Sequence, residues 1–206
     1  MRVQATRLGL GLVAFVLASW AAGEVWVSVI SSSEADAMRS LAEGRVQTVI
    51  EVARVVTWAG SAFLLVPLAV VCCLLLDRAG LRREAIALAL ALGGAMLISD
   101  LTKALTSRPR PPVEHLQSVT GSSFPSGHAT QASAFWISLT LALRATELPR
   151  AIVRVAAVIA LLVVLAVAWS RVYLGVHYPS DVVAGVILGT AWSFYVARCL
   201  ARPDAR

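Results

Sequence analysis

Three short segments hold the residues whose types and spacing could carry out chemistry, and each lies at the edge of a long apolar run. They are Lys103–Pro112, Phe124–His128 and Ser170–Asp181. Ionisable side chains are costly next to lipid, so those found there are first considered functional. The segments together supply ammonium, guanidinium, imidazole and carboxylate groups, which suggests a site that binds an anion and moves protons.

The basic residues of these segments predict a phosphate site. Lys103, Arg110 and Arg171 bring three positive charges to the ends of apolar runs. Arginine forks match phosphate oxygens bidentately, whereas lysine acts as a point charge. Pro111 and Pro112 follow Arg110 and stiffen its backbone, which limits how far that guanidinium can move.

The middle segment is typical of a helix start. Pro125 and Ser126 favour helix initiation, and Gly127 permits close approach of the backbone to a ligand. The free N–H groups and the dipole of a helix N-terminus attract anions. Taken alone, the segment fits a simple capped helix equally well. A phosphate-binding role for Ser126 and Gly127 therefore depends on the cations being nearby.

His177 and Asp181 lie four residues apart where the last apolar run begins, and Pro179 and Ser180 favour a helix start between them. A carboxylate in this place can orient the imidazole and stabilise its charged form. With two histidines and no evident serine or cysteine nucleophile, the pattern predicts that His177 attacks phosphorus. His128 would then protonate the leaving alkoxide and later activate water.

A metal site is the competing use of the same side chains. His128, His177 and Asp181 could supply three ligands to a divalent ion. The three basic residues beside them would repel such an ion. The charge pattern therefore favours a site without metal or other cofactor.

The elements that position these residues must be membrane helices. The chain has 206 residues, of which 58% are hydrophobic and 15% charged, and its mean hydropathy is +0.77. This composition predicts one membrane-embedded domain over residues 1–206. The net charge of +6 could suggest nucleic acid as a partner. However, the basic residues lie singly or in small groups at the ends of apolar runs, which is the membrane pattern.

The apolar runs predict an all-α bundle of six transmembrane helices. These spans cover about 8–30, 55–76, 85–105, 129–143, 151–169 and 182–200. The first also resembles a signal peptide, although an uncleaved span is favoured. Gly185 and Gly189 share a helical face with Asp181, which predicts close packing of the last helix against a neighbour.

The segment Ser31–Arg54 is more polar than the runs on either side of it. Its apolar residues fall roughly on one helical face. This pattern predicts an interfacial amphipathic helix between the first and second spans, with an ordinary solvated loop as the alternative.

The distribution of basic residues predicts the orientation in the membrane. More of them flank the apolar runs on the side that holds both termini, which favours a cytoplasmic location for that side. In this topology the three chemical segments all fall on the opposite, extracytoplasmic face. We therefore expect a multi-pass protein of the cell (inner) membrane with its site facing outward.

The three segments resemble the signatures of the type 2 phosphatidic acid phosphatase superfamily, the lipid phosphate phosphatases. The matching residues are Lys103 with Arg110-Pro111, then Pro125-Ser126-Gly127-His128, then Ser170-Arg171 with His177 and Asp181. Their order, their spacing and the six-span pattern are also similar to the family, so the resemblance covers most of the chain and is that of a bacterial-type integral membrane member.

The resemblance implies a metal-independent phosphatase of membrane lipids that forms a phosphohistidine intermediate. It implies catalytic roles for His177 as nucleophile, His128 as general acid and Asp181 as orienting carboxylate. It implies phosphate binding by Lys103, Arg110, Ser126, Gly127 and Arg171. Substrates in the family include phosphatidate, phosphatidylglycerol phosphate and polyprenyl diphosphates such as undecaprenyl diphosphate, so both phosphomonoesters and diphosphates stay open.

Three other functions fit parts of the pattern. A lipid-linked phosphotransferase would use the same site and pass the phosphoryl group to an acceptor other than water. The related haloperoxidases bind vanadate, but they are soluble and this chain is not. A transporter or channel would place polar residues in the middle of its spans, whereas here they gather at span ends.

Overall fold

The computed structural model describes residues 2–201, with the side chains of residues 4–26 and 33–201. All regular secondary structure in this part of the chain is helical. The elements are α1 (Arg2–Glu43), α2 (Gln47–Val56), the 3-10 helix η1 (Thr57–Gly60), α3 (Ala62–Arg78), α4 (Arg82–Leu105), α5 (Gly127–Leu143), α6 (Arg150–Tyr173) and α7 (Pro179–Leu200). The predicted all-α class is confirmed.

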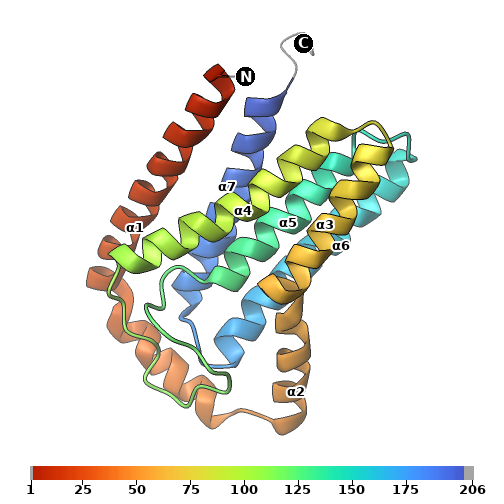
Figure 1. The fold of residues 1–206 in the computed structure, drawn as a ribbon. Coiled ribbons are helices and arrows are strands. Elements are labelled where there is room, and N and C mark those ends of the chain that lie inside the picture. The colour runs from red at the N-terminus through yellow and green to blue at the C-terminus, as the bar shows by residue number, and fades with distance from the viewer. Residues whose placement is uncertain (1, 202–206) are drawn as a thin grey trace.

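Helix α5 lies at the centre of the bundle and packs against α4, α6 and α7 (Figure 1). Its contact with α7 depends on the glycines that the sequence singles out. A Cβ atom at Gly185 would lie 2.8 Å from the carbonyl oxygen of Ser126, and one at Gly189 would collide with the carbonyl oxygen of Thr130. The predicted close packing of the last helix is therefore present, and its neighbour is α5.

Four of the described helical segments are long and apolar enough to cross a membrane. They are Gln4–Trp26, Arg82–Leu105, Arg150–Tyr173 and Pro179–Leu200. A fifth is present if Gln47–Gly60 and Ala62–Arg78, which meet at an angle of 42°, are counted as one broken span. Apolar side chains on the outside of the bundle, such as the 86% exposed Phe63, suit contact with lipid.

The predicted span 129–143, the fourth along the chain, corresponds to α5, which has only 17 residues. Most of its side chains are buried by other helices, so its length is not set by the thickness of the lipid around it. It also begins at Gly127, where the chain returns from the long loop 106–126. The protein is thus an integral helical membrane protein, and the count of six spans stays a prediction.

The segment Ser31–Arg54 does not form a single helix, and an interfacial location for its helical parts stays a prediction. Helix α1 continues to Glu43, the chain turns at residues 44–46, and α2 starts at Gln47. Gly44 lies at this turn, where a glycine costs less than it does inside a helix. The predicted span 55–76 is also shorter than expected: α3 begins only after Ser61, whose hydroxyl accepts a hydrogen bond from the N–H of Leu64.

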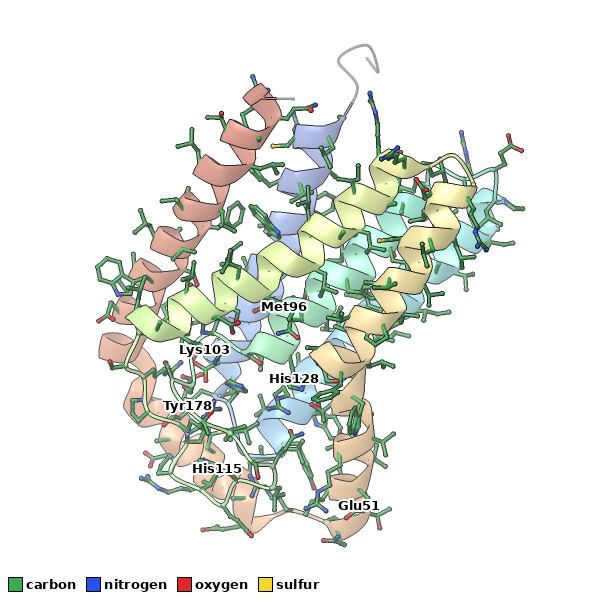
Figure 2. All side chains as sticks on the ribbon, in the orientation of Figure 1. Glu51, Met96, Lys103, His115, His128 and Tyr178 are labelled. Atoms are coloured by element: carbon green, nitrogen blue, oxygen red, sulfur yellow. The ribbon has the colours of Figure 1, made fainter. Side chains whose placement is uncertain are left out.

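The two ends of the bundle differ in what they carry. The N-terminus of α1 and the C-terminus of α7 lie together at one end (Figure 1). Lys103, His128 and Tyr178 lie toward the other end, close to the loop 106–126 and the second part of α1 (Figure 2). The end away from the termini is therefore where the candidate site must be sought.

Candidate functional site

The three chemical segments meet at the end of the bundle away from the termini. Lys103 lies in the last turn of α4, His128 in the first turn of α5, Arg171 in the last turn of α6, His177 just before α7 and Asp181 in its first turn. The charges of Lys103 and Arg171 act on both histidines, and the charge of His177 acts on His128. Residues 103, 128, 171, 177 and 181 are therefore neighbours in space.

The start of α5 is fixed directly to the start of α7. The backbone N–H of Ser126 donates a 3.0 Å hydrogen bond to the carbonyl oxygen of Asp181. The hydroxyl of Ser126 is buried and has no hydrogen-bond partner in the described structure. A Cβ atom at Gly127 would lie 3.9 Å from Cε of Lys103, so the first helical residue of α5 sits beside this lysine.

Lys103 and Arg110 donate their hydrogen bonds to backbone carbonyls. Lys103 Nζ lies 2.9 Å from the oxygen of Ser122. Arg110 Nη1 lies 2.7 Å from the oxygen of Val176, and its Nε and Nη2 atoms donate to carbonyls of the loop 106–126. Burial lowers the pKa of Arg110, while the carboxylate of Asp181 raises it. Both side chains are anchored without being neutralised.

Arg171 is held in a similar way from two further elements. Its Nη1 atom lies 2.9 Å from the hydroxyl oxygen of Thr57 in η1, and it also contacts the side-chain oxygen of Gln117. The side chain is 2% exposed, and its Nε atom has no partner in the described structure. A buried guanidinium with free donor capacity can bind an anion.

The three cations share one property: within the described part of the chain, none of them forms an ion pair with a carboxylate. Their acceptors are neutral carbonyl, hydroxyl and amide oxygens. Each cation therefore keeps its full charge for a ligand. This arrangement concentrates positive charge beside the two histidines and the N-terminus of α5.

His177 is 3% exposed and faces the carboxylate of Asp181. Its Nδ1 atom lies 3.5 Å from Oδ2 of Asp181, an electrostatic contact longer than an N–H···O hydrogen bond. Burial lowers the pKa of His177 to about 4; Asp181 raises it, and Lys103 and Arg171 lower it further. The imidazole is consequently neutral at pH 7, which leaves a nitrogen lone pair free.

Two residues to which the sequence analysis gives no role complete this group. Arg108 is 2% exposed, and its Nη1 atom lies 2.5 Å from Oδ1 of Asp181. Its Nη2 atom lies 2.6 Å from Oε2 of Glu34 on α1. The available signal was the Arg108-Pro109 pair, which directly precedes Arg110-Pro111 and repeats its form. No local pattern links Glu34 to either pair.

The described residues contain no group of three histidine, cysteine, aspartate or glutamate side chains placed as metal ligands. His128, His177 and Asp181 thus do not form the three-ligand cluster that a metal site would need.

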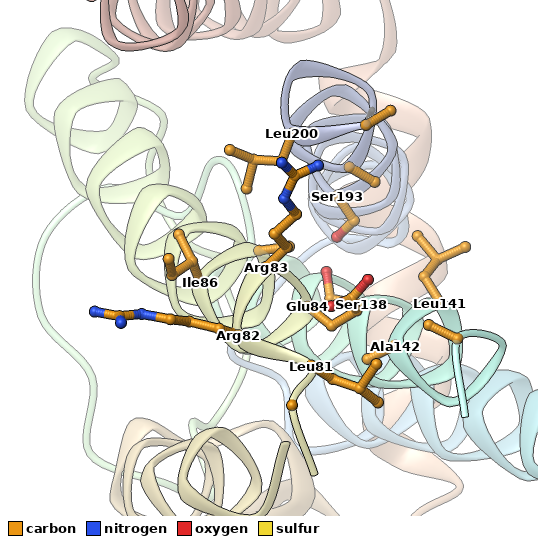
Figure 3. Close-up of a pocket in the computed structure, with 15 residues that line it drawn as sticks. Leu81, Arg82, Arg83, Glu84, Ile86, Ser138, Leu141, Ala142, Ser193 and Leu200 are labelled. Atoms are coloured by element: carbon orange, nitrogen blue, oxygen red, sulfur yellow. The ribbon is translucent and has the colours of Figure 1, made fainter. Parts of the chain in front are cut away.

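A cavity of about 800 Å³ lies elsewhere, between the N-terminal turn of α4 and the C-terminal turns of α5 and α7. Arg83, Glu84, Ser138 and Ser193 supply its polar lining (Figure 3). It contains none of the residues that the sequence analysis selects, and it lies toward the end of the bundle that holds the chain termini.

Membrane-crossing helices that gather cations and two histidines at one end define a helical membrane protein with a candidate anion site. Residues 84–204, more than half of the chain, match the PAP2 superfamily. The chain belongs to the PAP2 superfamily, as the resemblance of its signatures implies.

Several relatives are phosphatases by name. The chain is 40% identical over 99 residues to decaprenylphosphoryl-5-phosphoribose phosphatase of Mycobacterium tuberculosis, covering 46% of this chain and 49% of that protein. It is 35% identical over 115 residues to a putative undecaprenyl-diphosphatase of Escherichia coli, covering 52% of each. The chain spans about half the length of these relatives.

Two solved structures share the fold. The transmembrane PAP2 type phosphatidylglycerolphosphate phosphatase of Bacillus subtilis superposes with a TM-score of 0.79 at 25% identity, covering 92% of this chain and 94% of that one. Aquifex aeolicus LpxE superposes with a TM-score of 0.63 at 21% identity, covering 79% and 93%. The second likeness concerns the fold alone.

Proposed function

We propose that this protein hydrolyses a phosphomonoester or diphosphate of a membrane lipid through a phosphohistidine intermediate, without metal. One observation carries the proposal: Lys103, Arg110 and Arg171 converge beside two histidines while all their hydrogen bonds go to neutral oxygens. None of these cations is paired directly with a carboxylate in the described structure, so the site suits a tetrahedral dianion.

In the proposed reaction, Nε2 of His177 attacks phosphorus while the leaving alkoxide or phosphate departs from the opposite side. His128 donates a proton to that leaving group. Water, activated by His128, then attacks the phosphohistidine, and the P–N bond breaks to release inorganic phosphate and neutral His177. Asp181 stabilises the positive charge that the ring of His177 carries in the intermediate.

The surrounding groups stabilise the phosphoryl group during transfer. The charge in such a transition state is spread over three equatorial oxygens, so fixed donors around them are the main contribution. Lys103, Arg110 and Arg171 supply these donors in the proposal, and Ser126 and Gly127 add the N-terminus of α5. The anchoring of each cation by the backbone or by neutral side chains supports this role.

The names of the relatives support lipid substrates of two kinds, polyprenyl phosphates and glycerophospholipid phosphates. We propose that the site faces outward from the cell (inner) membrane, with both termini cytoplasmic. The termini lie at the end of the bundle away from the candidate site, which supports this orientation (Figure 1). A lipid could then enter sideways from the bilayer with its headgroup near the surface.

The test is a phosphate-release assay on the purified protein in detergent. Phosphatidate, phosphatidylglycerol phosphate and undecaprenyl diphosphate are offered separately, each with and without EDTA. We expect inorganic phosphate from at least one lipid and equal rates with the chelator. Loss of activity in EDTA would contradict the metal-free mechanism, and phosphate recovered only on another acceptor would identify a phosphotransferase.

A further inference from the structure

We infer that Arg108 and Glu34 are positioning residues for the candidate pair His177–Asp181, an inference that rests on the proposed phosphatase function. Neither residue touches the reacting atoms in the proposed mechanism. Both act through Asp181, whose carboxylate they hold in one orientation.

The guanidinium of Arg108 bridges two carboxylates from opposite ends of the sequence. Nη1 lies 2.5 Å from Oδ1 of Asp181 and Nη2 lies 2.6 Å from Oε2 of Glu34. Its Cζ atom also lies 4.4 Å from the centre of the Tyr178 ring. A planar guanidinium that is hydrogen-bonded along two edges and packed against a ring on one face has little freedom to rotate. Arg108 therefore fixes the orientation of the carboxylate of Asp181.

Glu34 links Arg108 to the start of α7 through hydrogen bonds from Ser180. Its Oε1 atom accepts a 2.8 Å hydrogen bond from the backbone N–H of Ser180, and its Oε2 atom accepts a 2.7 Å hydrogen bond from the hydroxyl of Ser180. The first N–H groups of a helix have no partner within the helix. Glu34 thus satisfies one of them from α1, directly beside Asp181.

The two oxygens of Asp181 are divided between different partners. Oδ1 accepts from Arg108, whereas Oδ2 accepts a 2.8 Å hydrogen bond from the N–H of Tyr178 and faces Nδ1 of His177. If the guanidinium were absent, the N–H of Tyr178 would still hold Oδ2 near His177, but the carboxylate plane could tilt about its Cβ–Cγ bond. The bond to Arg108 therefore fixes the plane in which Oδ2 faces the histidine.

Arg108, Glu34 and Asp181 also determine the electrostatic environment of the His177 ring. Glu34 and Asp181 carry two negative charges and Arg108 one positive charge, so this buried group has a net charge of −1 on the side of α1 and α7. The other charged or titratable groups that face the ring are Lys103 from α4, His128 from α5 and Arg171 from α6. Removing Arg108 leaves the histidine facing more negative charge, and removing the charge of Glu34 leaves it facing less.

Substitutions of Arg108 and of Glu34 should therefore shift the pKa of His177 in opposite directions. Arg108→Gln should raise the pKa of His177 and move the acid limb of kcat/KM to higher pH. Glu34→Gln, which has nearly the same size, should lower that pKa and move the limb to lower pH. Because the chain has only three histidines, an imidazole NMR titration of the detergent-solubilised protein reports the same pKa without any substrate.

The kinetic effects should fall on kcat. A misplaced catalytic group lowers the rate on the order of 100-fold. We therefore expect kcat of Arg108→Gln to fall by about 100-fold, with KM changed by less than about threefold.

Arg108→Lys keeps the charge but cannot bridge both carboxylates. It should recover part of the activity and leave the acid limb where it is. Arg39→Gln is the matched control, because Arg39 forms an exposed ion pair with Asp36 on the same helix as Glu34.

Opposite displacements of the pKa, with the control unchanged, would support the inference. Displacements in the same direction, or none, would overturn it even if the wild-type protein releases phosphate. If the wild-type protein releases none from any lipid, the proposed function fails instead, and the NMR titration still decides whether Arg108 and Glu34 act on His177. If Arg108→Gln does not fold, we expect a lower pKa of His177 in Glu34→Gln and an unchanged pKa with reduced kcat in Arg108→Lys; an unchanged pKa in Glu34→Gln, or full kcat in Arg108→Lys, would overturn the inference.

Discussion

The backbone N–H of Ser126 lies 3.0 Å from the carbonyl oxygen of Asp181, so the first residues of α5 and α7 are joined by a main-chain hydrogen bond. His128 follows Ser126 by two residues, and His177 precedes Asp181 by four. The bond therefore holds the backbone segments that carry the two histidines next to each other. A substitution that separates these two helix starts should consequently disturb the site.

Gly185→Ala is expected to make such a separation. The added Cβ would lie 2.8 Å from the oxygen of Ser126, closer than a carbon atom can remain, and the contact is with backbone. Overpacking of this kind costs about 1–3 kcal/mol, so we expect a lower unfolding temperature in detergent and a loss of activity. Gly93→Ala is the control, since nothing lies within 4 Å of its added Cβ. Equal unfolding temperatures and activities of the two variants would mean that the α5–α7 contact can accommodate a methyl group at residue 185.

The two histidines should fail in different ways. His177→Ala should abolish turnover and leave no labelled phosphate on the protein, because the proposed nucleophile is gone. His128→Ala should lower kcat by about 10²–10⁴-fold, the usual contribution of a general acid and base. With an activated leaving group it should still accumulate phosphoenzyme, which acid-quench labelling would detect. Full activity of His177→Ala would show that the nucleophile is assigned wrongly.

The pH dependence should reflect a histidine that resists protonation. The pKa of His177 is about 4, below the usual 6.5, because its neutral form is favoured by burial. This group should therefore leave kcat/KM unchanged between about pH 7 and 5 and reduce it only as the pH falls through about 4. Over the same window the unfolded chain binds the additional proton, so the free energy of unfolding should decrease as pH falls from 6.5 towards 4. A kcat/KM profile corrected for titration of the substrate would be inconsistent with this assignment if the His177 limb lay near 6.5.

Orientation in the membrane can be tested with cysteine labels. Cys72, Cys73 and Cys199 are first replaced by serine, and single cysteines are then placed at Ser118 or Leu148, which are both exposed and lie in loops at opposite ends of the bundle. An impermeant maleimide added to intact cells should label residue 118 and should reach residue 148 only after the membrane is opened. The reverse pattern would place the candidate site in the cytoplasm.

The sequence is enough to predict much of the site, because its signatures lie at helix ends. A helix end has a fixed height in a bundle, so Lys103, His128, Arg171 and Asp181 could be placed at one end without knowing how the helices pack. Whether their proposed roles are right is not decided by that placement. Arg108 is different, since its partners are Asp181, 73 residues away, and Glu34, 74 residues away. Contacts of that range depend on the full packing of α1 against the bundle.

The boundaries of the first helices escaped prediction for a related reason. The polar and apolar alternation of Ser31–Arg54 continues across Gly44, so periodicity gave no sign that α1 ends there. The length of α1 is itself a tertiary effect. Its second part carries Glu34 to Arg108 and Ser180, and these buried contacts stabilise a helix that composition alone would divide at the membrane surface.

The side chains of Lys103, Arg110 and Arg171 donate their hydrogen bonds to uncharged oxygens. This affects the stability of the protein without a ligand. Three like charges gathered in a partly buried place repel one another, and none of them is paired directly with a carboxylate in the described structure, although Asp181 offsets part of the repulsion. In the proposed function the lipid headgroup supplies the remaining negative charge. A tetrahedral oxyanion such as phosphate or vanadate should consequently raise the unfolding temperature in proportion to the logarithm of its concentration above saturation of the site. A bound phosphate group would thus stabilise the folded protein as well as serve as its substrate.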